Sequence, residues 1–270
     1  MINYYEIIPN IVSRKETIIM FHGWGSTIES QIQLGKELSE LGYKVVIPEI
    51  KYHDSRQALN NHFEQQILQT YFWKTIFETI DEEDEMIDQL CLQKENTILL
   101  GSSMGGFIAS GMFFSTNCYS GLININGSSS FLYSEKDFRK KDRREPLNES
   151  ELETFIKYDP KFKDSTIRKP VLFLHGEQDL VIPIGGQLDF LTTKHHSYID
   201  FLKYKDVNHT ITSSMKNDLI NWVDKNFKKE GFFMSENSLP NGLAKPAIRA
   251  LTSAGYLHLE QFTQLSEAEV

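Results

Sequence analysis

The sequence predicts an α/β fold, doubly wound, with a mostly parallel sheet flanked by helices. Five short apolar runs alternate along the chain with segments of helical spacing; they are residues 16–21, 43–47, 97–100, 121–127 and 170–176. Strands that alternate with helices favour crossover connections and therefore parallel pairing. Residues capable of chemistry follow three of these runs, and ligands bind beyond the carboxyl ends of strands in such sheets.

The outer elements follow the same alternation. Residues 2–8 alternate loosely and indicate an edge strand, and residues 198–202 indicate the last strand. Residues 29–41 have apolar side chains at helical spacing and end before Gly42, which favours a helix with a glycine stop. Residues 213–227 predict a closing amphipathic helix.

Two polar segments interrupt this pattern. Residues 53–92 are acidic with apolar residues at helical spacings, which indicates one broken helix or two. We interpret the acidic run at 81–85 as a solvated helix start or face rather than a metal site. Residues 128–169 carry charges of both signs, and they are either a solvated excursion or a small lid over the strand ends.

Composition limits the class of protein. The chain has 270 residues with 40% hydrophobic and 24% charged residues, and its formal net charge of −9 argues against general affinity for nucleic acid or anionic membranes. Cys91 and Cys118 form no disulfide framework and no zinc-ligand spacing. No apolar stretch approaches a membrane span of about 18 residues. We expect a cytoplasmic protein, not bound to a membrane, that uses neither metal nor other cofactor.

The sequence at 101–105, GSSMG, fits the G-x-S-x-G pattern of a nucleophile elbow. An apolar run enters the motif and a helical pattern leaves it, so Ser103 is expected at the apex of a sharp strand-to-helix turn. Such a turn needs neighbours without bulky side chains, because the strand and the helix pass within contact distance. Ser103 is therefore the candidate nucleophile.

A serine hydroxyl needs a base to take its proton and an acid to orient that base. Downstream of the elbow, Asp179 lies just after the run at 170–176, where a loop returns across the strand ends. Glu177 is the rival acid and Asp206 a weaker one. A turn-forming aspartate that caps its own loop is the alternative interpretation of Asp179.

Eight histidines compete for the role of base. His209 follows the last predicted strand, and it alone lies downstream of Asp179 at a strand-to-helix loop. The others precede the elbow, precede the last strand, adjoin a strand-end glycine or lie in the tail; they are His22, His53, His62, His175, His195, His196 and His258. Elimination leaves His209, in the order serine, acid, histidine that the elbow predicts.

An acyl-transfer site also needs donors for the developing oxyanion. We expect the backbone amide of Met104, which directly follows the nucleophile, to be one. The second is expected from the loop after the run at 16–21, where the sequence is HGWG, and we assign it to the backbone amide of Trp24. A simple glycine turn is the alternative interpretation of that loop.

With these motifs in place, the chain resembles an α/β-hydrolase of the serine-esterase kind. The resemblance covers roughly residues 1–230 and rests on HGWG at 22–25, GSSMG at 101–105, GEQD at 176–179 and Asn-His at 208–209. It is similar to small bacterial esterases and to dienelactone-hydrolase-like and prolyl-oligopeptidase-like catalytic domains. Serine at position 103 departs from the cysteine nucleophile of true dienelactone hydrolases.

The resemblance implies a triad of Ser103, Asp179 and His209 and a carboxylesterase that acts on small acyl esters without a cofactor. A thioesterase or a peptidase would use the same machinery. The alternative from another class is a non-catalytic protein with the hydrolase fold, whose tail recruits a partner or nucleic acid.

The tail is expected to be separate. Residues 1–230 form the predicted hydrolase domain, and residues 231–270 a linker with an incomplete helical appendage. The appendage resembles the start of a helix-hairpin-helix-like module, but the sequence ends before a glycine-containing hairpin that would contact phosphates. We therefore expect docking on the main domain or partial order, and binding of nucleic acid is not expected.

Overall fold

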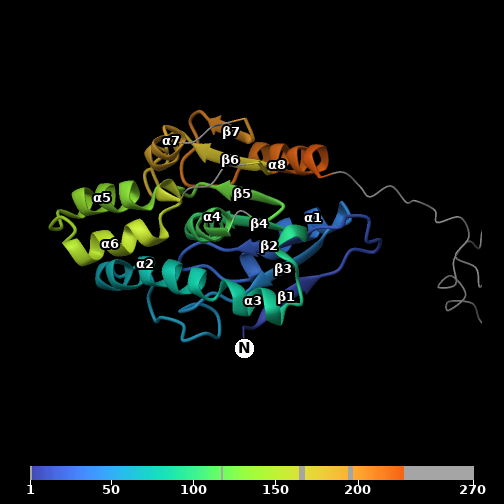
Figure 1. Cartoon of the computed structure of the whole chain (residues 1–270), viewed down its shortest axis with the longest axis horizontal. Coiled ribbons are helices and arrows are strands. Elements are labelled where there is room, and N and C mark those ends of the chain that lie inside the picture. Colours follow the sequence, from blue (N-terminus) through green and yellow to red (C-terminus); the bar gives the residue numbers. More distant parts are fainter. Residues whose placement is uncertain (1, 117, 164–167, 194–196, 228–270) are drawn as a thin grey trace, which may run out of the picture. The chain divides into compact units, whose positions relative to one another are not determined.

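The computed structural model describes residues 2–116, 118–163, 168–193 and 197–227. These contain a seven-stranded sheet of order β1-β3-β2-β4-β5-β6-β7. The strands are β1 (Tyr4–Ile7), β2 (Thr17–Phe21), β3 (Lys44–Pro48), β4 (Thr97–Ser102), β5 (Gly121–Ile125), β6 (Val171–Gly176) and β7 (Ile199–Tyr204). Only the β1–β3 pair is antiparallel among these neighbours, which confirms the predicted doubly wound, mostly parallel sheet (Figure 1).

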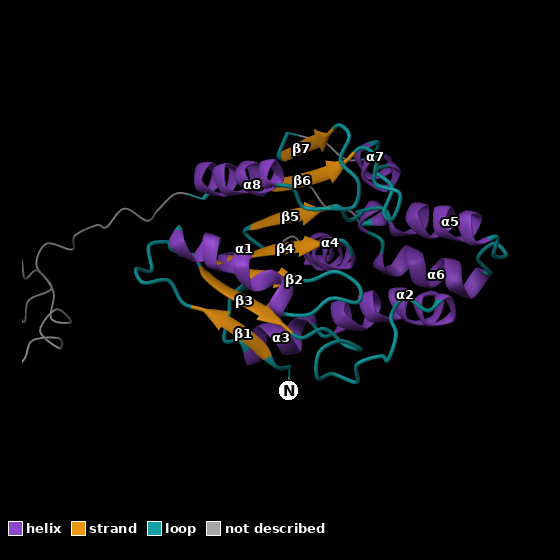
Figure 2. Cartoon of the chain, turned by 180° about the vertical axis from the view of Figure 1, so that it is seen from behind, coloured by secondary structure: helices purple, strands orange, loops and turns teal. Residues whose placement is uncertain are grey.

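Helices cover both faces of the sheet (Figures 1 and 2). They are α1 (Glu29–Glu40), α2 (Gln65–Asp81), α3 (Glu83–Gln89), α4 (Met104–Thr116), α5 (Phe131–Asp142), α6 (Glu149–Tyr158), α7 (Gly185–Leu191) and α8 (Ser213–Asn226), with short 3₁₀ turns η1 (Lys94–Asn96) and η2 (Pro160–Phe162). Helices α1 and α8 pack apolar side chains such as Leu38 and Val223 on one face. Helices α2 to α7 contribute to the core on the other.

Helix α4 carries the elbow and is buried along its first eleven residues. A helix that is apolar all round belongs in the interior, and this one lies between the sheet and α2. Gly111 allows the close approach, because a Cβ there would lie 2.3 Å from Ile80 Cδ1 of α2. On the sheet side, the Asn124 amide of β5 donates to Gly106 O at 2.9 Å and to Ser110 Oγ at 2.8 Å.

The predicted excursion forms two helices, α5 and α6, which lie at the end of the molecule toward which the arrowheads of β4, β5 and β6 point (Figure 2). We call residues 128–163 the cap. Residues 164–167 of the expected lid segment are outside the described part of the chain. The cap therefore stands beyond the carboxyl ends of the strands, where a site is expected.

The segment at 53–92 forms two helices, α2 and α3. The prediction of a solvated acidic run is wrong at Glu83, which is 7% exposed. Glu83 accepts a hydrogen bond from the Tyr119 hydroxyl at 2.9 Å and pairs with Lys94 at 2.6 Å. Its charge is tolerated in the interior because partners far along the chain satisfy it.

The described residues, 2–227 with the gaps given above, pack as one compact unit. The linker and appendage expected at 231–270 lie outside the described residues, so this division of the chain stays a prediction. Among the helices that the structure describes, none combines the length and apolar character needed to cross a bilayer.

Candidate active site

The elbow has the geometry that its glycines require. Ser103 lies between β4 and α4 with φ of 54°, in the left-handed region that is costly for a residue with a side chain. A Cβ on Gly101 would lie 1.9 Å from Gly105 O, and a Cβ on Gly105 would lie 2.1 Å from Phe21 O. Both contacts are with backbone atoms, which have little room to move. Glycine at both positions therefore lets the strand, the turn and the helix meet with Ser103 exposed to the site.

Asp179 follows β6 and is 3% exposed. Its Oδ1 accepts the backbone N–H groups of Val181 and Ile182, each at 2.9 Å. Its Oδ2 lies 2.7 Å from Nδ1 of His209. The carboxylate thus caps its own loop, as the alternative interpretation expects, while its second oxygen binds the histidine.

His209 lies between β7 and α8, and its Nε2 is 2.8 Å from Ser103 Oγ. A carboxylate only accepts, so Nδ1 donates to Asp179, and Nε2 is left to accept a hydrogen bond from the Ser103 hydroxyl. Asn126, at the end of β5, holds the histidine loop by donating from Nδ2 to Thr210 O at 2.9 Å. Its Oδ1 accepts the Gly176 N–H at 3.0 Å, which ties that loop to β6.

The rival acids lie elsewhere. Glu177 is exposed, and exposed Asp206 accepts a hydrogen bond from the side-chain amide of Gln178 at 2.8 Å.

Beside Asp179 lies His175, whose Nε2 donates to Ile182 O at 2.8 Å. Burial lowers the pKa of the His175 imidazole, so the ring is neutral near pH 7 and supports the acid's loop.

The loop after β2 passes beside the nucleophile. A Cβ on Gly23 would lie 3.2 Å from Ser103 Cβ and 3.7 Å from Ser103 Oγ. Trp24, the expected second oxyanion donor, is the next residue. Met104 is the first residue of α4, so its N–H lacks an acceptor within the helix. Trp24 and Met104 thus each follow one of two neighbouring strands, and the role of their amides as oxyanion donors stays a prediction.

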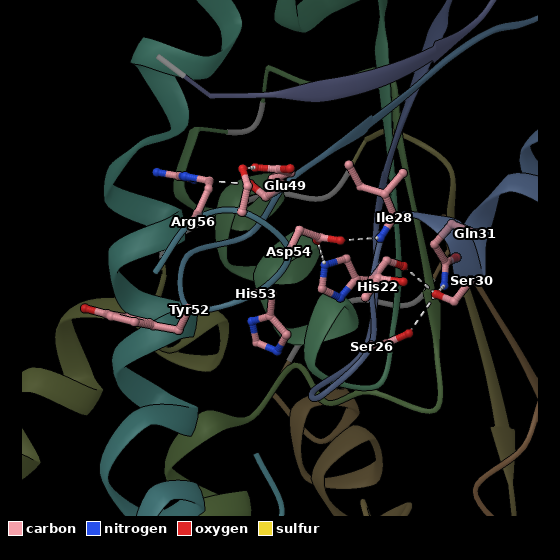
Figure 3. A network of polar contacts seen from close by, with 12 residues as sticks. His22, Ser26, Ile28, Ser30, Gln31, Glu49, Tyr52, His53, Asp54 and Arg56 are labelled. Carbon is pink, nitrogen blue, oxygen red and sulfur yellow. Dashed lines mark hydrogen bonds and ion pairs between the residues drawn. The ribbon is translucent and has the colours of Figure 1, made fainter. Parts of the chain in front are cut away.

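The rule of triad order excludes His53 and His62 as bases, but the structure places both against Trp24. Their rings meet the indole edge-on, with centroids 5.2 Å and 5.0 Å away. His22 Nε2 faces Asp54 Oδ2 at 3.3 Å (Figure 3). The sequence signal for His53 and Asp54 is their position after β3, because the carboxyl ends of the parallel strands β2 and β3 lie at the same edge of the sheet.

A cavity of about 470 Å³ opens onto Ser103 and His209. Its walls come from α2, from α5 in the cap and from the loops after β2 and β6. Most of the lining is apolar: Trp24, Phe63, Leu68, Phe72, Trp73, Phe138, Val181 and Ile182. A cavity of this size fits a small molecule.

The charged part of this lining is internally matched. Glu135 of the cap is 2% exposed and accepts hydrogen bonds from the Trp73 indole at 2.7 Å, Arg139 Nε at 2.6 Å and Arg144 Nη1 at 2.9 Å. A carboxylate with three donors offers little to a bound cation. Within the described residues, no group of three or more His, Cys, Asp or Glu side chains is arranged to hold a metal ion.

Comparison with known proteins places this geometry among relatives. The model of the prolyl oligopeptidase family matches residues 35–230. A protein of Bacillus subtilis (strain 168), "Putative esterase YitV", is 22% identical over 77% of this chain and 88% of its own length. The crystal structure of TT1662 from Thermus thermophilus superposes with TM-score 0.65 and 15% identity, covering 83% of this chain and 93% of that one. The crystal structure of Paleococcus ferrophilus monoacylglycerol lipase superposes with TM-score 0.62 and 14% sequence identity, covering 84% of this chain and 99% of that one.

Proposed function

The chain belongs to the prolyl oligopeptidase family of serine hydrolases, and we propose that it is a carboxylesterase with Ser103, His209 and Asp179 as its catalytic triad. One observation carries the proposal: a hydrogen-bonded line joins the three side chains, at 2.8 Å from Ser103 to His209 and 2.7 Å from His209 to Asp179. These contacts are within the range that proton transfer requires.

In the first half of the reaction, Ser103 Oγ attacks the ester carbonyl carbon while its proton passes to His209 Nε2. Asp179 stabilises the imidazolium through Nδ1 and keeps the ring oriented. The carbonyl oxygen becomes an oxyanion, which the backbone amides of Trp24 and Met104 stabilise. Collapse of the intermediate breaks the C–O bond, and His209 returns the proton to the leaving alcohol.

In the second half, water attacks the acyl-enzyme, and His209 takes one of its protons. The second tetrahedral intermediate expels Ser103 Oγ, which regains that proton from His209. The products are a carboxylic acid and an alcohol, and the enzyme is regenerated without a cofactor.

The cavity favours an ester with an apolar acyl group. Its lining is mainly aromatic and aliphatic, and Glu135, the buried carboxylate within it, is already bound to two arginines. A site for the free amino terminus of a peptide would need an uncommitted carboxylate there. The names of similar proteins, an esterase and a monoacylglycerol lipase, agree with ester hydrolysis.

The cap completes this site, and we assign it the role of a lid. Helix α5 brings Phe138 to the cavity wall. We also propose a cytoplasmic location, since Cys91 and Cys118 are free thiols. The substrate is a small molecule, and the net charge of −9 disfavours nucleic acid as a partner.

The test is hydrolysis of p-nitrophenyl butyrate by the purified chain and its Ser103→Ala variant. We expect the substitution to lower kcat by about 10⁴-fold or more, because no other group on this site supplies the nucleophile. Ser102→Ala, one residue away in β4, is the matched control and keeps the rate within about tenfold. Equal rates for the native chain and Ser103→Ala would overturn the proposal.

A further inference from the structure

The structure places a second histidine at the site, outside the triad. We propose that His53 is a positioning residue that fixes the loop carrying the oxyanion donor Trp24; this inference rests on the proposed function. We call residues 22–25 the oxyanion loop and residues 49–57 the support loop. The support loop follows β3, and the oxyanion loop follows the neighbouring strand β2.

His53 is 1% exposed and holds both loops through its two ring nitrogens. Its Nδ1 donates to Lys51 O at 2.9 Å, within the support loop. Its Nε2 accepts the backbone N–H of Gly25 at 3.0 Å, in the oxyanion loop. Only a neutral imidazole can donate with one nitrogen and accept with the other. Burial lowers the pKa of His53 to about 4, so the ring has this form near pH 7.

The bond to Gly25 matters because peptide groups are planar. The Gly25 N–H lies in the peptide that begins with the Trp24 carbonyl, so His53 fixes one side of Trp24. His22 Nδ1 donates to Gly23 O at 2.9 Å, and that carbonyl shares a peptide plane with the Trp24 N–H. Two histidines thus hold the two consecutive peptide planes that flank Trp24. The Trp24 N–H lies in the plane held by His22, and His53 holds the next plane, on the other side of the Trp24 Cα.

Other contacts join the same two loops. Asp54 Oδ1 accepts the Ile28 N–H at 3.2 Å, while its Oδ2 faces Nε2 of His22 (Figure 3). The Trp24 indole N–H donates to His62 O at 2.8 Å, beyond the support loop. Gly25 has φ of 68°, a conformation in which glycine is favoured, and a Cβ there would lie 2.7 Å from the Phe63 ring. The oxyanion loop is therefore held through both its backbone and its side chains.

The support loop is itself anchored to α2 and the turn that follows it. Arg56 makes two hydrogen bonds to the Glu82 carboxylate, at 3.0 Å and 2.8 Å. Tyr52, Asp54 and Gln57 have positive φ values of 64°, 47° and 58°. Such conformations persist in non-glycine residues where surrounding contacts over-determine them, and they gather at functional sites. The support loop is thus a rigid base from which His53 can position its neighbour.

The expected effect follows from pre-organisation. Removing an oxyanion donor costs about 10²–10³-fold in kcat. Freeing the loop that carries the donor leaves the donor present but misdirected for part of the time, so we expect a loss of about 10- to 100-fold in kcat. The loop's role is in the transition state, so KM should stay within about threefold.

The experiment compares two amides at position 53. In His53→Gln, the side-chain oxygen lies near the place of Nε2 and can accept the Gly25 N–H. In His53→Asn, the amide nitrogen lies near the place of Nδ1 and can donate to Lys51 O, but nothing reaches Gly25. His53→Met is a third variant, of similar size and without an acceptor. Steady-state kinetics with p-nitrophenyl butyrate are measured beside thermal midpoints and the Ki of a trifluoromethyl ketone, whose Ser103 adduct places an oxyanion in the hole.

We expect His53→Gln to keep kcat within about fivefold, whereas His53→Asn and His53→Met lose about 10- to 100-fold. The Ki of the ketone should rise in those two variants by a similar factor, while product inhibition by butyrate stays unchanged. Should His53→Asn fail to fold, the comparison of Gln with Met decides. Equal kcat in the folded variants, or equal loss in Gln and Met, overturns the role of His53 while Ser103-dependent hydrolysis by the native chain upholds the proposed function. Absence of that hydrolysis overturns both.

Discussion

The carboxyl edge of the sheet and the cap contribute to the same cavity but are held together by different means. At the edge, a Cβ on Gly101, Gly105 or Gly176 would lie 1.9 Å, 2.1 Å or 2.4 Å from backbone oxygens. In the cap, the buried Glu135 is held by side chains, through its bonds to Arg139 and Arg144. Backbone atoms have little room to move, whereas side chains can repack. We therefore expect the carboxyl edge to determine the reaction and the cap to determine which substrates bind.

The largest expected effect tests the edge through its buried acid. Asp179→Asn keeps the shape of the side chain but no longer favours the tautomer in which His209 accepts from Ser103. We expect kcat for p-nitrophenyl butyrate to fall by about 10³–10⁴-fold, with the fold retained in circular dichroism. Glu177→Gln, the exposed neighbouring acid, is the control and should stay within about twofold. A similar loss in both variants would mean that local charge, rather than the bond to His209, sets the rate.

The next effect contrasts two glycines. In Gly105→Ala the new methyl group meets the Phe21 carbonyl, so we expect the free energy of unfolding to fall by about 3 kcal/mol or more. In Gly185→Ala the methyl group meets the ring of Tyr133 in the cap, which is 43% exposed and can move. Its cost should be below about 1 kcal/mol. Urea denaturation measures both, and equal costs would remove the distinction between edge and cap.

The smallest effect concerns substrate range. Phe138→Ala removes an aromatic wall that the cap supplies to the cavity. We expect kcat/KM for p-nitrophenyl octanoate to fall about tenfold while the value for the acetate changes less than twofold, because the longer acyl chain has more apolar surface to bury against that wall. Phe162→Ala, in η2 and 47% exposed, is the control. A uniform loss for both esters would show that the cap supports the triad rather than the acyl group.

The same contrast explains what can be predicted from the sequence. The elbow is readable because its glycines and serine are contiguous and lie between an apolar run and a helical pattern. Asp179 and His209 can be predicted because each follows a predicted strand, and the carboxyl ends of parallel strands meet at one edge of the sheet. The structure brings His209 to Ser103 and Asp179 to His209, at the edge where the alternating pattern places them.

Residues that act through distant partners are not readable in this way. Glu83 belongs to an acidic run typical of a solvated face, and only the fold brings Tyr119 and Lys94 to it. Likewise, nothing in the sequence near His53 names Gly25 as its partner, 28 residues away. The order rule for a catalytic base excludes His53, because it asks only about proton transfer to serine. Helix α7 is not among the elements that the sequence predicts, for a different reason: two glycines in its first turn weaken the helical pattern.

The proposed mechanism requires that His209 activates the hydroxyl of Ser103. The most direct measurement is labelling with a fluorophosphonate probe followed by peptide mass analysis, since only an activated serine is phosphonylated rapidly. In the native chain we expect one adduct, on Ser103. The labelling rate should fall by about 10³-fold or more in His209→Ala, and no adduct should form in Ser103→Ala. Labelling of a different serine, or a labelling rate that does not depend on His209, would rule out the proposed triad.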